Sequence, residues 1–468
     1  AITSAIDDTL KTPYAHMFDF VIGRELPGNV TVEAAYVGRY GKRLLTKWDL
    51  SMPVNLVDPG SKMDYFTGAS KLAALAEVGD PTGFGVGTNP KNVTPIPYWQ
   101  NLYPGMAGHP ICDVYGFNSP KLPNGNPNPN YDPNFWPNAT ATQAVYDTYL
   151  CFAPDYTTAL EFLDQGGGLC DALGSCSRFG PYAYFQDQFA SLAGQSSVGW
   201  SYYDSLQLTA RKRMSKGLQF QLNYTYSHSL DLTSDVERGG AFGSFFDGGY
   251  SEFVVNSWNL HSAYGNSSYD LRHQVNANWV YELPFGHGRW LAKNAPSVLN
   301  QVIGGWDFSG LWRWTSGFPF SVINCRSCWP TNWNLQGNAS LFGAAPALGT
   351  TRNAPGLKGL PSPFPQGNGA VTAFRRDRPG EVGFRNQFRG DGFFTIDTAL
   401  RKTWSITEGS RLTFSWDVFN LTNTPKFDTG SITALPDISS SFGRYNSTLA
   451  TCDGAAGRCM QFGLRLSF

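Results

Sequence analysis

The chain has 468 residues, of which 15% are charged and 15% are aromatic, and its formal net charge is −1. Globular proteins average about 25% charged residues, so this sequence is poor in charge, and its near-zero net charge shows no basic excess of the kind that nucleic-acid-binding proteins carry. No apolar run reaches the ~18–20 residues that a membrane-spanning helix needs, so a membrane-embedded form must cross the bilayer with strands.

Two strands joined by a tight turn are the first predicted elements. Residues 14–26 and 30–45 alternate apolar and polar side chains with a period of two, and Pro27-Gly28 predicts the turn between them. The same alternation predicts further strands at 199–213, 218–231, 269–283, 306–322, 393–404, 411–421 and 460–468. Their lengths suit the ~9–11 residues that a tilted strand needs to cross a bilayer.

The connections between these strands fall into two length classes that alternate along the chain. Long connections are expected at 46–197, 232–267, 324–390 and 422–456, and shorter ones at 214–217, 284–305 and 405–410. Short turns at one end and long extracellular loops at the other are typical of outer-membrane barrels, whereas soluble sandwiches do not divide their connections in this way. We therefore predict an all-β fold: one antiparallel up-and-down transmembrane β-barrel domain over 1–468, partial, with about nine strands.

The first long loop, 46–197, is too long to be structureless inside a compact domain. We expect short helices over 64–78 and 139–152, the second capped by Asn138, and a helical turn at 295–302 in an inner connection.

The last strand, 460–468, places an apolar residue at every even position and ends on an aromatic ring. This pattern is similar to the signal that the barrel-assembly machinery reads, and its candidate residues are Phe462, Leu464, Leu466 and Phe468. Because an odd number of strands begins at the outer face, we expect N-terminal barrel strands and a plug to lie outside this sequence. The sheet should then stay open or close poorly between its first and last strands.

Strand parity separates a lipid face from a lumen face. We expect the apolar parity, with its tryptophans, to contact outer-membrane lipid. The polar parity supplies the lumen-facing candidates Gln219, Gln221, Asn223, Asp397, Arg401 and Asp417.

Eight cysteines lie in connections or at the outer end of a strand, which predicts disulfides formed in an oxidising compartment. Short spacings favour local pairs and leave one longer link, although other connectivities stay open: Cys170–Cys176, Cys325–Cys328, Cys452–Cys459 and Cys112–Cys151. A redox motif or half of a zinc site are the alternatives for Cys325-x-x-Cys328. The first needs a helix N-terminus and the second needs another ligand pair.

Residues for catalysis are few. Three histidines and three aspartates near the fourth and fifth predicted strands could supply a triad, but polar residues are common at the outer rim of a barrel: His228, His261, His273, Asp231, Asp235 and Asp247. We predict no enzymatic activity, no cofactor and no metal site. Aromatic residues of the loops are better candidates for contact with a ligand: Tyr98, Trp99, Trp136, Phe245, Phe246 and Trp333.

Several short motifs follow one another in an order that resembles the C-terminal barrel portion of a TonB-dependent outer-membrane receptor, in particular the Oar-like branch. They are Leu26-Pro27-Gly28-Asn29, Ala35-Tyr36-Val37-Gly38, Ile96-Pro97-Tyr98-Trp99-Gln100-Asn101-Leu102, Tyr281-Glu282-Leu283-Pro284-Phe285-Gly286, Gly304-Gly305-Trp306, Ser316-Gly317-Phe318-Pro319-Phe320, Asp417-Val418-Phe419-Asn420-Leu421-Thr422-Asn423 and the terminal Phe468. The resemblance implies a plug in the lumen and a short segment that recruits the TonB complex, and neither occurs in this sequence.

The sequence therefore favours part of a TonB-dependent transporter that moves a bulky, unidentified ligand across the outer membrane of a Gram-negative-type bacterium. Two alternatives stay open: a surface adhesion or structural protein anchored by the barrel, and a passive porin. A plug and a TonB-recruiting segment upstream would support the first function, and their absence would support the others.

Overall fold

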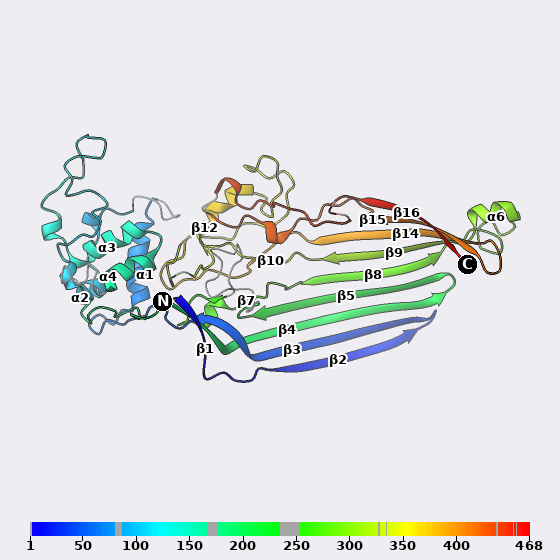
Figure 1. Ribbon diagram of the computed structural model, residues 1–468, viewed down its shortest axis with the longest axis horizontal. Helices are drawn as coiled ribbons and strands as arrows, with labels where there is room; N and C mark the ends of the chain where they lie inside the picture. The colour runs from blue at the N-terminus through cyan, green and yellow to red at the C-terminus, as the bar shows by residue number, and fades with distance from the viewer. Residues whose placement is uncertain are drawn as a thin grey trace.

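The computed structural model describes residues 2–79, 87–165, 176–234, 253–325, 328–333, 335–436, 439–452, 454 and 456–468. Its main feature is a broad antiparallel sheet in which nine long strands follow one another in a meander (Figure 1). In chain order these strands are β2 (Tyr14–Leu26), β3 (Val30–Asp49), β4 (Ser191–Ser215), β5 (Leu218–Asp231), β8 (His273–Glu282), β9 (Trp306–Thr315), β14 (Phe393–Ser405), β15 (Arg411–Phe419) and β16 (Cys459–Ser467).

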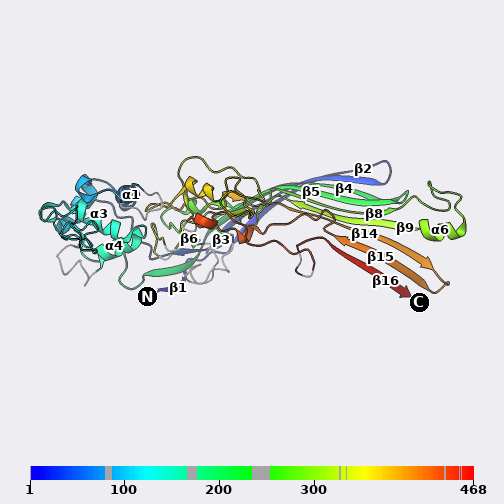
Figure 2. The same cartoon turned by 90° about the horizontal axis from the view of Figure 1, so that it is seen from above.

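The predicted up-and-down order of about nine strands is confirmed. Neighbouring strands pair in the order β16-β15-β14-β9-β8-β5-β4-β3-β2, with every step antiparallel. Within the part of the chain that the structure describes, β2 and β16 do not pair with each other. The sheet is therefore open. Figure 2 shows its two edge strands, β2 and β16, on opposite sides.

Several boundaries differ from those predicted, and β8 begins at His273 rather than at position 269. The sixth predicted strand does not continue to 322, because β9 ends at Thr315 and Pro319 has no N–H to extend the ladder. The short strand β10 (Pro319–Phe320) instead pairs with β13 (Phe388–Arg389). At the outer end β3 and β4 run beyond the predicted positions 45 and 199, and the sequence analysis also missed β1 (Ile2–Ile6), which pairs in parallel with the start of β4.

The strand register places polar side chains opposite polar ones across the sheet. Directly opposed residues of antiparallel strands share a face. A row of such residues across the sheet therefore lies entirely on one side of it. One row is polar throughout and contains Glu33, Thr209, Asn223, Asn276, Arg313 and Thr395. The adjacent row is apolar and contains Ile22, Ala34, Leu208, Tyr224, Val275, Trp314 and Phe394.

The first long connection folds into a domain of its own, which we call the helical loop domain (residues 50–190). Its helices are α1 (Tyr65–Ala76), α2 (Pro97–Leu102), α3 (Ala141–Phe152) and α4 (Tyr156–Asp164), with 3-10 turns η1 (Pro90–Asn92), η2 (Pro104–Met106) and η3 (Trp136–Asn138). Figure 1 shows it at the end of the molecule opposite the C-terminus. Its core is rich in aromatic rings and separate from the sheet.

The helices predicted at 64–78 and 139–152 correspond to α1 and α3, but the predicted cap of the second is wrong. Asn138 lies in η3, and Thr140 caps α3. The Thr140 side chain accepts the N–H of Gln143 while the Gln143 side chain accepts the N–H of Thr140. This reciprocal capping box satisfies two otherwise unpaired helix donors, which a single Asn cap could not do.

The remaining outer connections share a second core. Short elements occur here: β6 (Phe253–Val254), η4 (Leu260–Ala263), β7 (Gly265–Asn266), β11 (Ser340–Leu341), η5 (Gly367–Ala373), β12 (Phe374–Arg375), η6 (Thr429–Ser431) and η7 (Ser439–Ser441). Phenylalanines from the third long connection (316–392) pack on Phe442 and Tyr445 of the fourth (420–458). At the opposite end the connections are short, apart from one that contains α6 (Ser297–Ile303).

Among the described residues, none of the helices combines the length and the apolar character needed to cross a bilayer.

Candidate functional site

The predicted lumen-facing residues lie on one face of the sheet. Gln219, Gln221 and Asn223 follow one another on β5, and the register places Gln219 in the same row as Asp417. The carboxamide oxygen of Asn223 accepts from Thr209 at 3.1 Å and from Gln221 at 3.3 Å. The face is therefore lined by uncharged hydrogen-bonding groups near its centre.

Charged groups occur on the same face toward β14 and β15. The Asp397 carboxylate accepts the N–H of Asn420 at 2.8 Å, which holds the end of β15 against β14. Arg401 lies 3.6 Å from Asp417, and the arginine side chain is 58% exposed. Arg401 is therefore the more available of the two charges for a molecule that passes along this face.

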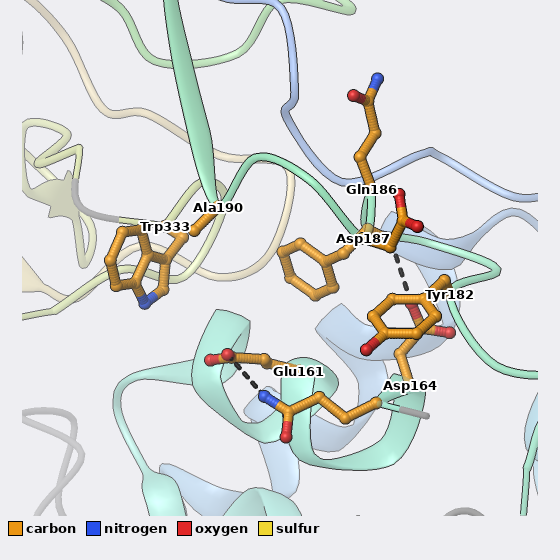
Figure 3. A pocket seen from close by; sticks show the side chains of 9 residues that line it. Glu161, Asp164, Tyr182, Gln186, Asp187, Ala190 and Trp333 are labelled. Carbon is orange, nitrogen blue, oxygen red and sulfur yellow. Dashed lines mark hydrogen bonds between the residues drawn. The ribbon is translucent and has the colours of Figure 1, made fainter. Parts of the chain in front are cut away.

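A pocket of about 190 Å³ lies where the helical loop domain meets the third connection (Figure 3). Its lining comes from α4, the segment that leads into β4, and Trp333 of the third connection: Glu161, Asp164, Gln165, Tyr182, Phe185, Gln186, Asp187, Ala190 and Trp333. Aromatic rings and carboxylates thus face one cavity. Such a lining can contact the apolar face of a ligand and accept hydrogen bonds from its polar groups.

Asp164 lines this pocket and positions the segment beside it. Its carboxylate accepts three successive backbone N–H groups, from Ala183 at 2.8 Å and from Tyr184 and Phe185 at 2.9 Å. Burial raises the pKa of Asp164, and the three donors offset this only in part. Glu161 accepts from Gln165 at 2.7 Å on the same helix.

Only one of the described loop aromatics predicted to contact a ligand lines the pocket, namely Trp333. The interpretation of Tyr98, Trp99 and Trp136 as contacts is wrong for this structure, because all three are at most 2% exposed and belong to the core of the helical loop domain. Their polar atoms are satisfied internally: Tyr98 bonds Tyr184, Trp99 bonds the Gly68 carbonyl and Trp136 bonds Asp113. Phe245 and Phe246 lie outside the described residues.

Buried ion pairs fasten the third connection to its surroundings, and the sequence analysis missed them. Arg385 pairs with Asp231 at the end of β5, and Arg389 pairs with Asp270 just before β8. Arg378 pairs with Glu77, the residue after α1, at 2.7 Å, which joins the third connection to the helical loop domain. Partners separated by more than a hundred residues leave no local signal in a sequence.

Three of the predicted disulfides are present: Cys112–Cys151, Cys325–Cys328 and Cys452–Cys459. Cys176 is also disulfide-bonded, and its predicted partner Cys170 lies outside the described residues. Cys325 and Cys328 are at most 3% exposed, which fits a structural bond rather than a reactive one.

The described histidines do not form a triad. His228 bonds Asn266 at 2.9 Å, His273 bonds Tyr224 at 2.9 Å, and His261 packs against the Trp200 ring. Asp231 is engaged by Arg385, and Asp235 and Asp247 lie outside the described residues. In the described ranges, no group of three or more His, Cys, Asp or Glu side chains is arranged to hold a metal ion.

Known proteins were compared with the chain by family, by sequence and by structure. Residues 1–461 match the model of a family described as outer membrane beta barrel domain. No curated protein matches the sequence.

Among solved structures, the chain is similar to the outer membrane transporter YddB from Escherichia coli (TM-score 0.33, 11% identity, covering 99% of this chain and 34% of that one). It is also similar to the FrpB iron transporter from Neisseria meningitidis (TM-score 0.32, 9% identity, 99% and 32% covered). A third similar structure is P. aeruginosa FpvA bound to heterologous pyoverdines (TM-score 0.31, 8% identity, 96% and 27% covered). The chain spans about a third of the length of these proteins or less.

The family model extends from the first residue into β16, so it reaches every strand of the meander and covers the loops between them. The two-faced register and the two classes of connection agree with this match. The chain belongs to the outer membrane β-barrel domain family, and its place in the cell is the outer membrane.

Proposed function

We propose that this chain forms part of the wall and the outer binding surface of a TonB-dependent transporter for a bulky substrate. The observation that carries the proposal is the combination of a continuous polar face with ordered outer loops that have cores of their own. A channel for small solutes needs little more than an open mouth, whereas capture of a large ligand needs a preorganised surface.

The pocket beside Trp333 is the place on that surface best suited to a first contact. It combines the Trp333, Tyr182 and Phe185 rings with the Glu161 and Asp187 carboxylates. Ligand captured there would move to the polar face, where Asn223 and Gln221 offer uncharged hydrogen-bonding groups. In this proposal energy enters through a plug contacted by the TonB complex, as the resemblance to TonB-dependent receptors implies.

Depletion of nutrients from the medium would test this function while the substrate is still unidentified. Cells with and without the complete receptor gene are grown in a complex medium, each in the presence and absence of TonB, and the medium is analysed by mass spectrometry. We expect compounds that disappear only when both the receptor and TonB are present. Depletion that does not require TonB would indicate a passive porin and overturn the proposal.

Adhesion is the second candidate function, and the compact core of the helical loop domain favours it. In that case loss of the receptor would leave the composition of the medium unchanged but would reduce attachment of cells to a surface or to one another. Trp333→Ala should weaken substrate depletion if transport is correct. Trp258→Ala, which removes an exposed loop tryptophan outside the pocket, serves as the matched control.

A further inference from the structure

The connection between β8 and β9 contains a helix whose apolar side faces outward. In α6, Val298 is 82% exposed, Val302 is 64% exposed and Leu299 is 48% exposed. At 100° per residue these three side chains lie along one arc of the helix. In water a helix buries such an arc against its own protein, so the exposure of this arc distinguishes α6 from a soluble surface helix.

One polar residue of the same helix, Asn300, faces the protein, whereas Ser297 and Gln301 are exposed. The Asn300 carboxamide oxygen lies in the connection and accepts the N–H of His287 at 2.8 Å. Trp290, in the same connection, is 84% exposed. The connection therefore presents a tryptophan and an apolar helix face outward and keeps the Asn300 side chain inside.

Two tryptophans from the sheet fix the position of α6. The indole N–H of Trp306 donates to the Val302 carbonyl at 2.8 Å, and the indole N–H of Trp404 donates to the Gln301 carbonyl at 2.9 Å. Lys402 lies between these rings, with its ammonium 5.5 Å and 5.3 Å from their centroids, and donates to the Gly304 carbonyl at the end of the helix. These contacts satisfy the carbonyl groups that a helix leaves unpaired at its C-terminus.

The side of the sheet to which α6 is attached is the apolar one. Trp404 lies in the row of Leu412 and Leu466, and Lys402 lies in a row with Phe414 and Leu464. Figures 1 and 2 place α6 at the end of the sheet where β16 ends, which is the end with the short turns. Short turns face the periplasm in barrels of the outer membrane.

We propose that α6 and Trp290 lie in the inner leaflet of the outer membrane, as an interfacial helix that contacts phospholipid. The apolar arc continues the lipid-facing surface of the sheet at the level where tryptophans gather in membrane proteins. Lys293, which is exposed in the same connection, is placed to meet the lipid phosphates. The proposal rests on the location of the chain in the outer membrane and is independent of whether the protein transports a ligand.

Photocrosslinking in intact cells tests this proposal. The photoreactive residue p-benzoylphenylalanine replaces Val298, Val302 or, as the control on the polar side of the same helix, Ser297 in the complete receptor, and adducts are identified by mass spectrometry after irradiation. We expect phospholipid adducts at 298 and 302 in several-fold excess over 297. Adducts to another protein or to a second copy of this chain, equal labelling at 297 and 298, or no lipid adduct at 298 and 302 would overturn it.

A second variant tests the same contact without crosslinking. The double substitution Val298→Asp with Val302→Asp places two charges in the proposed lipid contact, whereas Ser297→Asp places one on the polar side. We expect several-fold less assembled protein in the outer membrane for the double variant and an unchanged amount for Ser297→Asp. An unchanged amount for the double variant would contradict the proposal.

Discussion

Arg385 of the third outer connection pairs with Asp231, the last residue of β5, and the two side chains are only 12% and 3% exposed. The same guanidinium group donates to the Ala263 carbonyl at 3.1 Å and to the Asp231 carbonyl at 2.8 Å. One side chain thus joins the end of a strand to two loops. Buried ion pairs therefore stabilise this end of the sheet, in addition to the aromatic core of the connections.

Removal of this arginine should loosen the rim. Arg385→Ala leaves the Asp231 carboxylate buried without its main partner, and breaking a buried pair in this way costs about 3–5 kcal/mol. Thermal unfolding of the purified protein in detergent would show a lower midpoint. The control is Arg401→Ala, which removes a side chain that is 58% exposed and 3.6 Å from Asp417, and it should change stability by less than about 1 kcal/mol. Equal effects of the two variants would contradict this account.

Neighbouring positions of β5 should respond differently to charge. Leu222 lies on the apolar face opposite Ala210 and Ala277, and Asn223 lies on the polar face opposite Thr209 and Asn276. An arginine on a lipid-facing strand position costs about 2–4 kcal/mol at mid-bilayer, whereas a lumen position tolerates it. Leu222→Arg should therefore lower the folded fraction, measured by the heat-dependent shift in electrophoresis, and Asn223→Arg should not. The reverse order would invert the assignment of the two faces.

The Cys112–Cys151 bond should stabilise the helical loop domain more than Cys452–Cys459 stabilises the fourth connection. The first bond closes a span of 39 residues and the second a span of 7. Loop-closure entropy gives about 4 kcal/mol for the longer span and about 2 kcal/mol for the shorter one. Each cysteine pair is replaced by serines, and the protease resistance of the loops is measured on intact cells. A larger loss of resistance without Cys452–Cys459 than without Cys112–Cys151 would contradict the prediction.

The stability of the helical loop domain should depend on pH through Asp164. Burial raises its pKa, so above pH ~4 the folded form keeps a proton that the unfolded form has lost. Stability from this group is therefore greatest at low pH and falls as pH rises through the raised pKa. Asp164→Asn cannot titrate, so its unfolding free energy should change less steeply with pH than that of the wild type. Parallel curves, followed by tryptophan fluorescence, would contradict the prediction.

Loss of the terminal ring should reduce assembly. Phe468 is 98% exposed and has the parity of Phe462, Leu464 and Leu466, which lie on the apolar face of β16. If the assembly machinery reads this strand, Phe468→Ala lowers the amount of protein in the outer membrane. Ser467→Ala, on the polar parity, is the control. Normal levels of the Phe468 variant, measured by immunoblotting of membrane fractions, would exclude this role.

Much of the sheet could be predicted because its apolar face and its polar face impose a strict period of two on the sequence. Residues 218–227 alternate without error, and β5 has the predicted boundaries, Leu218–Asp231. The predicted boundaries are wrong at the ends of β3 and β4 that lead into the first long connection. There β3 and β4 continue past a register shift between Lys42 and Leu44, and neither face has to be apolar.

The candidate site was predicted less well because contacts between distant loops decide it. Trp99 and Trp333 are both loop tryptophans in sequence, but Trp99 is buried and bonds the Gly68 carbonyl, whereas Trp333 lines a pocket. The pairing of Arg378 with Glu77 spans 301 positions and has no local pattern. A period or a spacing reports local geometry, and these contacts are long-range.

The length of β4 determines how far the helical loop domain stands from the middle of the sheet. It has 25 residues, more than twice the ~9–11 that a tilted strand needs to cross a bilayer. The surplus extends β4, with β3 paired beside it, beyond this length toward the helical loop domain. If the long connections face outward, as the sequence predicts, antibodies and bacteriophages that approach the cell will meet the surface of α1 to α4 before the rest of the sheet.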